Sequence, residues 1–390
     1  MALPIYLDHN GTCPPRPQAV AAMVEVLSLP GNPSSVHAQG REARRRVEVA
    51  RRQVAALLNL PPATLTFTGS GTEANALVLA SAGDRPIITS AIEHASVLEA
   101  AQGGVRCPVT RDGVVDLVAL EALLVAAGRP ALLSLMAVNN ETGVIQPVAE
   151  AAALARRHGA LFHCDASQAV GRLAWDWGAI APDYLTVSAH KIGGPQGVGA
   201  LAVRDGMPVV PLLRGGGQER RRRAGTENVA GIVGFGAAAA ACDVEGFARL
   251  AVLRDGLEDR LRAAAPGLLV AGADAPRVAN TSCLVTPGWR GETQVMALDL
   301  AGFAVSSGSA CSSGKVAASH VLAAMGLGGD LAGSAIRVSL GWPTTAEDVA
   351  RFADAWIALH TRRGPAPVAQ QATLPPQDMQ SVISQTARQQ

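Results

Sequence analysis

The sequence predicts an α/β fold in which a mainly parallel β-sheet is wrapped by helices and followed by a smaller domain. Apolar runs of strand length alternate with helical patterns over roughly the first 240 residues, and this alternation is typical of parallel sheets. The pattern changes past about residue 245. With 390 residues the chain is long enough for one large domain and one smaller domain.

The elements of the large domain follow one another along the chain. The expected strands are the apolar runs at residues 64–68, 86–90, 131–138, 160–165, 184–188 and 199–203. Between them lie helical patterns at residues 41–58, 73–82, 117–127 and 148–158. Ligands bind beyond the carboxyl ends of the strands in such sheets, so polar residues directly after the apolar runs are candidates for a site.

The second half of the chain predicts a smaller domain. A long helix, some short strands and a final helix near residues 346–360 follow residue 245. We expect a large domain over residues 16–245 and a small C-terminal domain over residues 246–363, which the N-terminal segment 1–15 joins. Residues 364–390 are rich in Pro, Ala, Gln and Ser without an apolar period, which is typical of a flexible tail.

Composition excludes several classes of protein. Apolar residues make up 48% of the chain and the net charge is +1, which fits a globular enzyme and argues against nucleic acid or an acidic membrane as partner. Charges or turn residues interrupt every apolar stretch that could span a bilayer. The N-terminus MALPIYLDHNG lacks the charged start and apolar run of a secretion signal. We therefore expect a cytoplasmic protein.

Cysteine and lysine usage narrows the chemistry. The six cysteines are scattered, without metal-ligand spacing, so we expect neither a disulfide framework nor a metal site of the chain's own. Lys191 and Lys315 are the only lysines among 33 Lys and Arg residues. Arginine stays protonated, whereas a lysine amine can lose its proton and form a Schiff base. These two positions are therefore candidates for that chemistry.

Two polar segments follow the first and fourth expected strands. Residues 68–73 (TGSGTE) open a helix with glycines, which is either a simple turn or a site where backbone N–H groups bind an anion. Asp165 ends the run at 160–165. It is either a helix cap or a carboxylate that keeps a pyridine nitrogen protonated, with Gln168 donating to the ring hydroxyl.

Two further segments carry a lysine and a cysteine. Ser188, His190 and Lys191 directly follow the run at residues 184–187, and a lysine at a strand end stands out in a chain so poor in lysine. Residues 306–315 (SSGSACSSGK) place Cys311 on a glycine–serine loop that we expect to be mobile. A reactive thiol needs such access, and the alternative is a surface loop with an incidental cysteine.

With these segments in view, the sequence closely resembles the class V aminotransferase family, and within it the cysteine desulfurases of the nitrogen-fixation and iron–sulfur-cluster type. The similarity runs from about Tyr6 to Trp356. Its ordered motifs are YLDHN at 6–10, GNPSSVH at 31–37, TGSGTE at 68–73, EH at 93–94, NNETG at 139–143, DASQ at 165–168, SAHK at 188–191, RAGT at 223–226, SGSAC at 307–311 and IR at 336–337.

The resemblance implies the fold of type I pyridoxal-phosphate (PLP) transferases. This fold has a mainly parallel seven-stranded sheet with helices on both faces, plus a smaller C-terminal α+β domain, and it works as a homodimer. Lys191 would hold PLP as a Schiff base. The resemblance also implies the other coenzyme contacts. Asp165 would bind the pyridine nitrogen and Gln168 the ring oxygen. The phosphate would be bound by Gly71, Thr72, Ser188 and His190, together with Thr226 of the partner subunit.

The resemblance also implies the substrate contacts. His94 would stack on the coenzyme ring and assist proton transfer, whereas its plainer interpretation is a packed core histidine. Asn140 and Arg337 would bind the substrate carboxylate, Arg337 with two parallel hydrogen bonds. The plainer interpretations of these two are a turn residue and a surface ion pair.

The implied activity converts L-cysteine to L-alanine. Lys191 would take the α proton, and the Cys311 thiolate would attack the substrate sulfur and keep it as a persulfide. The loop would then carry this sulfur to a scaffold protein for iron–sulfur clusters, where Cys311 would contact a cluster iron transiently. A nitrogenase-dedicated pathway and tRNA thiolation would use the same active site.

Departures from the family and rival functions stay open at this point. The usual start Asp-Asn-Ala-Ala-Thr-Thr-Pro reads DHNGTCP at residues 8–14 here, close to the substrate, and the arginine run at 220–223 is denser than the family needs. The nearest rivals are a selenocysteine lyase or an aminotransferase, although transamination needs no cysteine. A rival of another class is a non-catalytic scaffold, against which Lys191, Asp165 and Cys311 argue together.

Overall fold

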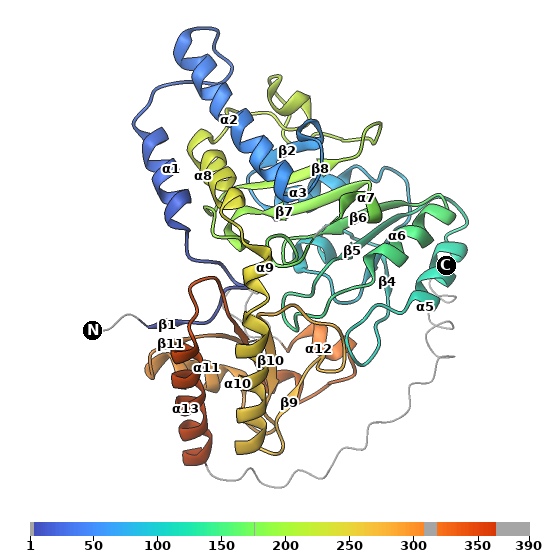
Figure 1. Cartoon of the computed structure of the whole chain (residues 1–390). Coiled ribbons are helices and arrows are strands. Elements are labelled where there is room, and N and C mark those ends of the chain that lie inside the picture. Colours follow the sequence, from blue (N-terminus) through green and yellow to red (C-terminus); the bar gives the residue numbers. More distant parts are fainter. Residues whose placement is uncertain (1–3, 175, 308–317, 364–390) are drawn as a thin grey trace.

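The computed structural model describes residues 4–174, 176–307 and 318–363. One half of the molecule holds a large sheet with helices around it, and the other half holds short strands and further helices (Figure 1). The chain passes between the halves through α9 (Val244–Phe247) and α10 (Leu250–Ala264). Within the described residues no single helix is both long and apolar enough to cross a bilayer. Helix α8 (Val229–Ala240) meets that test only together with the segment Val244–Ala264, across a 74° bend.

The large sheet has seven strands in the order β2-β8-β7-β6-β5-β3-β4. Their bounds are Leu65–Thr68 (β2), Ile87–Ser90 (β3), Val105–Cys107 (β4), Leu132–Met136 (β5), Leu161–Asp165 (β6), Tyr184–Ser188 (β7) and Gly199–Val203 (β8). All neighbours pair in parallel except β8, which is antiparallel to both β7 and β2. This topology confirms the predicted fold class.

Both faces of this sheet are buried, because successive side chains of a strand point to opposite faces. Leu133 of β5 belongs to an apolar core shared with α2, α5, α6 and α8, whereas its neighbour Leu132 belongs to a second core with α3 and α4. In the same way Leu185 and Tyr184 of β7 face opposite cores. The strands therefore appear in the sequence as continuous apolar runs.

The helices of this half cover the two faces of the sheet. Their bounds are Pro17–Leu27 (α1), Ala38–Leu57 (α2), Gly71–Ala80 (α3), Ala95–Leu98 (α4), Leu117–Ala126 (α5), Val148–Arg157 (α6), Trp177–Ile180 (α7) and Val229–Ala240 (α8). The sequence predicted four of these. Helix α2 begins three residues earlier than expected, because the His37 side chain accepts a hydrogen bond from the backbone N–H of Gly40 and caps the helix.

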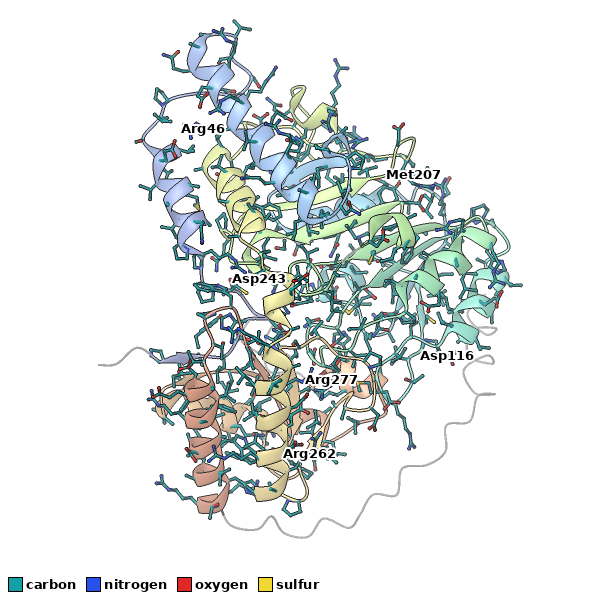
Figure 2. All side chains as sticks on the ribbon, viewed as in Figure 1. Arg46, Asp116, Met207, Asp243, Arg262 and Arg277 are labelled. Atoms are coloured by element: carbon teal, nitrogen blue, oxygen red, sulfur yellow. The ribbon has the colours of Figure 1, made fainter. Side chains whose placement is uncertain are left out.

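The smaller half contains two short sheets and three longer helices. A four-stranded sheet has the order β12-β13-β10-β9, with bounds Ser306–Ser307 (β12), Ala335–Ser339 (β13), Thr281–Val285 (β10) and Leu269–Val270 (β9). The helices are α10, α11 (Gly291–Leu300), the short α12 (His320–Ala324) and α13 (Ala346–Arg363). Arg277 forms a buried ion pair with Glu258 of α10 at 2.7 Å, and this pair ties the helix to the region of β10 (Figure 2).

The N-terminal segment lies with the smaller half. Strand β1 (Ile5–Tyr6) pairs in parallel with β11 (Phe303–Ala304), and the backbone N–H of Ser339 donates to the carbonyl of Leu7. Polar residues 8–12 then extend toward the end of the large sheet. Residues 8–12 therefore lie at the boundary between the two halves, although the strand before them belongs to the smaller half.

One predicted loop begins as a strand. Residues 306–315 were expected to form a loop throughout, but Ser306 and Ser307 form β12, paired with Arg337 and Ile336 of β13. The backbone groups of these serines find ladder partners on β13, which outweighs the loop preference of a Gly–Ser sequence. The remainder of that segment, including Cys311, and the tail 364–390 lie outside the described residues.

Candidate active site

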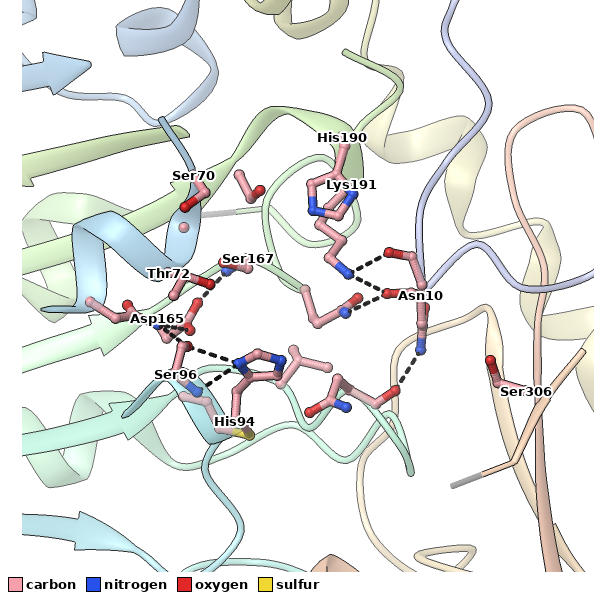
Figure 3. Close-up of a pocket in the computed structure, with 18 of the residues that line it drawn as sticks. Asn10, Ser70, Thr72, His94, Ser96, Asp165, Ser167, His190, Lys191 and Ser306 are labelled. Carbon is pink, nitrogen blue, oxygen red and sulfur yellow. Dashed lines mark hydrogen bonds between the residues drawn. The ribbon is translucent and has the colours of Figure 1, made fainter. Parts of the chain in front are cut away.

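A cavity of about 400 Å³ lies at the carboxyl ends of the parallel strands and reaches the smaller half of the molecule (Figure 3). It brings together residues that the sequence spreads from position 8 to position 337. The predicted residues that line it are Gly71, Thr72, His94, Asn140, Asp165, Gln168, Ser188, His190, Lys191 and Arg337. Thr226 is exposed and does not line the cavity of its own chain.

One wall of the cavity is the N-terminus of α3. Ser70 caps this helix by accepting from the backbone N–H of Glu73 at 3.0 Å. The Glu73 carboxylate in turn accepts from the N–H of Gly69 and from Arg223 Nε, at 2.7 and 2.9 Å. Gly199 of β8 approaches so closely that a Cβ there would lie 2.5 Å from the Ser70 carbonyl carbon. The turn and helix start are therefore held in place for an anion.

Asp165 is fixed at the end of β6 by two donors. Its Oδ1 accepts from the N–H of Ser167 and its Oδ2 accepts from Asn75 Nδ2, both at 2.9 Å. It does not cap a helix, so that interpretation is wrong. Beneath it lies His163, whose ring nitrogens bond to the hydroxyls of Ser134 and Thr186, and burial lowers the pKa of His163 to about 4. The Asp165 carboxylate is therefore held by neutral donors, and the nearby His163 ring is neutral at pH 7.

Lys191 lies on a 3-10 turn, Ala189–Lys191, directly after β7. Its Nζ donates to the carbonyl oxygens of Asn10 and Gly11 at 2.5 and 2.7 Å (Figure 3). The neighbouring His190 bonds through Nδ1 to the Thr12 hydroxyl at 3.1 Å. Burial, together with the nearby charge of Lys191, lowers the pKa of His190 to about 4, so this ring is neutral at pH 7.

His94 enters the cavity from the cap of α4. Its Nδ1 accepts from the backbone N–H of Ser96 at 3.1 Å, and burial lowers its pKa. The Ser96 hydroxyl lies 2.8 Å from the same nitrogen and also accepts from Asn75 Nδ2, which bonds to Asp165 as well. His94 is therefore linked to Asp165 through two polar side chains, and it is not a residue of an apolar core.

Arg337 and Asn140 meet on the opposite side of the cavity. Arg337 of β13 is 4% exposed and donates from Nη1 to the Asn140 carbonyl at 3.0 Å and from Nη2 to Asp8 Oδ1 at 2.7 Å. Its Nε is buried without a hydrogen-bond partner in the described part of the chain. A buried guanidinium that lines a cavity is not a surface ion pair, so that alternative is wrong. It suits a carboxylate ligand.

Several lining residues escaped the sequence prediction. They are polar groups that support the predicted ones, namely Asp8, Asn10, Gly11, Ser70, Asn75, Ser96, Ser167 and Ser306. Asn75 could have been found, because it lies four residues after Gly71 on the same face of α3. Asn10 lies in the YLDHN motif, but its role could not have been found, because its partners Thr281 and Arg172 are far away in the sequence.

The other cysteines of the described residues are structural. Cys13, Cys107, Cys164 and Cys283 are buried and Cys242 is partly buried, and burial raises the pKa of each thiol. Thiols in such surroundings are inert. No group of three or more His, Cys, Asp or Glu side chains suited to a metal ion occurs among the residues that the structure describes.

The residues of the cavity fit the coenzyme that the resemblance implies. The space of about 400 Å³ has a capped helix N-terminus with Ser188 and His190 nearby for a phosphate, a fixed carboxylate for a ring nitrogen, and an amine for an aldehyde. Gln168 donates from Nε2 to the Asn10 carbonyl at 3.1 Å, while its buried Oε1 has no partner within the described ranges. Such an unpaired buried oxygen indicates a missing polar ligand.

Comparison with known proteins gives the same family throughout. The model of the class-V aminotransferase family matches residues 5–352. A cysteine desulfurase of Cereibacter sphaeroides is 45% identical over 363 residues, covering 89% of this chain and 93% of that relative. An IscS-like cysteine desulfurase of Mycobacterium tuberculosis is 40% identical over 366 residues, covering 88% and 93%.

Solved structures share the fold. A NifS-like protein from Rickettsia africae matches with a TM-score of 0.86 at 34% identity, covering 92% of this chain and 99% of that one. SspA in complex with cysteine matches with a TM-score of 0.74 at 28% identity, covering 86% and 98%. The fold around the cavity is thus that of enzymes that use pyridoxal phosphate.

Proposed function

This chain belongs to the class-V aminotransferase family and is a PLP-dependent cysteine desulfurase, and we propose that it holds the sulfur removed from L-cysteine as a persulfide on Cys311. One observation carries this proposal. A single cavity joins an amine, a fixed carboxylate and a buried guanidinium, those of Lys191, Asp165 and Arg337. These are the groups that a coenzyme-bound amino acid requires.

The residues divide into those for the coenzyme and those for the substrate. Lys191 would hold the aldehyde of the coenzyme, Asp165 its ring nitrogen, and the N-terminus of α3 with Ser188 its phosphate. Bound there, the coenzyme supplies a protonated ring that absorbs the charge developing at the substrate Cα. Arg337 and the Asn140 side chain bind the substrate carboxylate, which fixes the direction of its thiol.

The chain's own groups then transfer protons and one sulfur atom. The Lys191 amine takes the α proton of the substrate, and the neutral ring of His94 lies beside it to assist. The Cys311 thiolate attacks the substrate sulfur, so that an S–S bond forms as the substrate's Cβ–S bond breaks and its electrons pass to carbon. Protonation of that carbon, together with return of a proton from Lys191 to Cα, yields L-alanine.

The position of β12 supports the role of Cys311. Ser306 of this strand lines the cavity, and Cys311 follows it by five residues. An extended chain of five residues spans up to roughly 17 Å. A thiol at this distance along the chain is within reach of the substrate sulfur and of an acceptor beyond the cavity mouth.

The direct test follows sulfur and alanine together. The holoenzyme is incubated with L-cysteine without oxygen, and persulfide is mapped by mass spectrometry. We expect one labile sulfur on Cys311, and we expect Cys311→Ser to remain yellow but form neither persulfide nor sulfide. The control Cys242→Ser removes a partly buried thiol and should retain transfer. A persulfide mapped to another cysteine contradicts the proposal.

The acceptor is proposed to be a scaffold protein for iron–sulfur clusters. The curated relatives are named for desulfuration and not for the acceptor, so this step rests on the Gly–Ser context of Cys311. Labelled sulfur is offered in parallel to an iron–sulfur scaffold protein and to a tRNA-thiolation acceptor. Transfer to the scaffold alone supports the proposal, and transfer to the tRNA acceptor alone overturns it.

We also propose a homodimer in which Thr226 of the partner subunit completes the phosphate site. Thr226 is exposed and lies outside the cavity of its own chain. Light scattering should give twice the chain mass, and Thr226→Ala should weaken coenzyme binding without changing that mass. A monomer that binds the coenzyme fully would exclude this arrangement.

Selenocysteine is the second candidate substrate, because the same cavity would accept it. Parallel assays with L-cysteine and L-selenocysteine decide between them. Exclusive release of selenium would replace desulfuration with selenocysteine lyase activity. A transaminase would instead consume a keto acid, which we expect to have no effect.

A further inference from the structure

The Lys191 amine rests on a backbone turn that the proposed chemistry does not explain. Its Nζ donates to the carbonyl oxygens of Asn10 and Gly11, at 2.5 and 2.7 Å. The turn is closed by the N–H of Gly11 and the N–H of Thr12, which both donate to the Asp8 carbonyl. Two convergent carbonyl oxygens are suitable acceptors for the N–H groups of an amine.

Asn10 holds this turn with a side chain whose hydrogen-bonding capacity is fully used. It is 2% exposed. Its Nδ2 donates to the Asn140 carbonyl at 3.1 Å and to Thr281 Oγ1 at 2.9 Å (Figure 3 shows the first of these). Its Oδ1 accepts from Arg172 Nη1 at 2.6 Å and from Asn280 Nδ2 at 3.1 Å. An amide with both donors and both acceptors paired has one orientation.

The backbone of Asn10 is held as well. Its N–H donates to Ser339 Oγ at 2.9 Å, and its carbonyl accepts from Gln168 in addition to Lys191. Of its side-chain partners, Arg172 comes from the large domain and Thr281 from the small domain. The residue therefore locks the turn between the two domains, at the point where Lys191 reaches it.

Asn10 also accepts a hydrogen bond from the buried guanidinium of Arg172. This guanidinium is 5% exposed, and within the described ranges no ion pair joins it to a carboxylate. Its shortest hydrogen bond is the one to Asn10 Oδ1. A buried cation without a carboxylate partner is stabilised by neutral oxygens such as Asn10 Oδ1. The Asn10 amide is therefore held by partners at its oxygen as well as at its nitrogen.

From this geometry we infer that Asn10 is a positioning residue for Lys191, whose amine rests on the carbonyl oxygens of Asn10 and Gly11 whenever it is not bonded to the coenzyme. The inference rests on the proposed function of Lys191. It gives the amine a defined place during the part of the reaction in which substrate occupies the coenzyme.

The same residue connects the amine to the substrate site. The Asn140 carbonyl accepts from Asn10 Nδ2 and also from Arg337 Nη1, at 3.1 and 3.0 Å. The resting place of Lys191 and the guanidinium proposed for the substrate carboxylate therefore share one carbonyl. Asn10 thus fixes the Lys191 amine and the Arg337 guanidinium relative to each other, across the boundary between the domains.

The test uses the reactivity of Lys191 in the full chain. With two lysines in the sequence, brief acetylation at pH 8 can be followed by mass spectrometry at Lys191, with Lys315 as internal reference. The coenzyme-free protein is compared with the holoenzyme. In Asn10→Ala the coenzyme-free amine should be labelled about three- to tenfold faster than in the wild type, because its hydrogen bonds are no longer held.

Two further variants guard against misfolding and general loosening. Thr281→Val removes one of the four side-chain partners of Asn10, and we expect an increase of about twofold. Asn32→Ala removes an exposed contact to the Ser34 N–H outside the cavity and should leave the rate unchanged. Should Asn10→Ala fail to fold, judged by circular dichroism, Thr281→Val decides the outcome.

The outcomes separate the inference from the function beneath it. If the coenzyme protects Lys191 from acetylation but neither variant changes the rate in the coenzyme-free protein, the role of Asn10 is refuted and the proposed function stands. If the coenzyme gives Lys191 no protection in the wild type, the proposed role of Lys191 itself fails. Faster labelling in both variants, with protection by coenzyme, supports the inference.

Discussion

Arg337 Nη2 donates to Asp8 Oδ1 at 2.7 Å, and this partly buried contact joins residues 329 positions apart in the sequence. Asp8 belongs to the N-terminal segment and Arg337 to the central strand β13. The carboxylate holds one edge of the guanidinium, so the remaining N–H groups keep a fixed direction at the cavity. A positively charged group in a fixed orientation is suited to a substrate carboxylate.

Replacement of Arg337 tests this orientation. Arg337→Lys keeps the charge but loses the planar fork, so we expect KM for L-cysteine to rise about tenfold while kcat changes much less. Steady-state alanine formation measures both constants. The exposed Arg290 gives the matched control, because Arg290→Lys should change neither. A fall in kcat at constant KM would show that Arg337 does not serve in binding.

Replacement of Lys191 tests the coenzyme bond. Lys191→Ala should give no borohydride-trapped adduct on the chain and lower kcat by about 10³-fold, the range of a lost acid–base group. Peptide mapping of the reduced protein is the measurement. Lys315→Ala supplies the comparison with the chain's other lysine and should retain the trapped adduct at position 191. An adduct at Lys315 in the wild type would assign the coenzyme bond to that lysine and contradict the role of Lys191.

The buried carboxyl group of Glu93 should lower the free energy of unfolding at alkaline pH. It is fully buried, its Oε1 accepts from Ser90 Oγ and the Met136 N–H, and burial together with nearby Asp165 raises its pKa from 4.5 to about 8. The folded state thus favours the neutral acid. Its contribution to stability is present below pH 4.5 and is lost as the pH rises through 8.

Glu93→Gln removes this titration while keeping the shape of the side chain. Between pH 5 and pH 9 the free energy of unfolding of the wild type should fall by at least about 1.4 kcal/mol more than that of the variant. Urea unfolding of the holoprotein at several pH values measures the difference. Parallel curves for the two proteins would mean that Glu93 does not titrate in this range.

Alanine substitutions at two glycines should change the free energy of unfolding in opposite directions. A Cβ at Gly341 would overlap the ring of His9, which is 1% exposed, so Gly341→Ala should lower the free energy of unfolding by about 2 kcal/mol. Gly256 lies inside α10 and a Cβ there meets open space, so Gly256→Ala should raise it by about 0.5–1 kcal/mol. Thermal unfolding compares them, and equal effects would refute the packing argument.

Much of the half that contains the large sheet could be predicted from local pattern. Strands β7 and β8 have the predicted bounds, because each is a continuous apolar run buried on both faces and ended by a polar residue or a turn. Strand β4 was missed, since Val105 and Arg106 are exposed and leave an edge strand of three residues without an apolar pattern. Helices α1 and α8 were missed as well. Helix α8 is rich in alanine and glycine and shows little amphipathic contrast.

The sequence by itself determined which residue types follow the strands, and so identified Asp165, His190 and Lys191, because a parallel sheet brings all such strand ends to one edge. Only the tertiary structure decided how Asn10 serves them. Its partners lie between 130 and 329 residues away, and no local periodicity encodes a contact over that separation. Hydrogen bonds of this kind exist only once two domains have packed around the same buried amide.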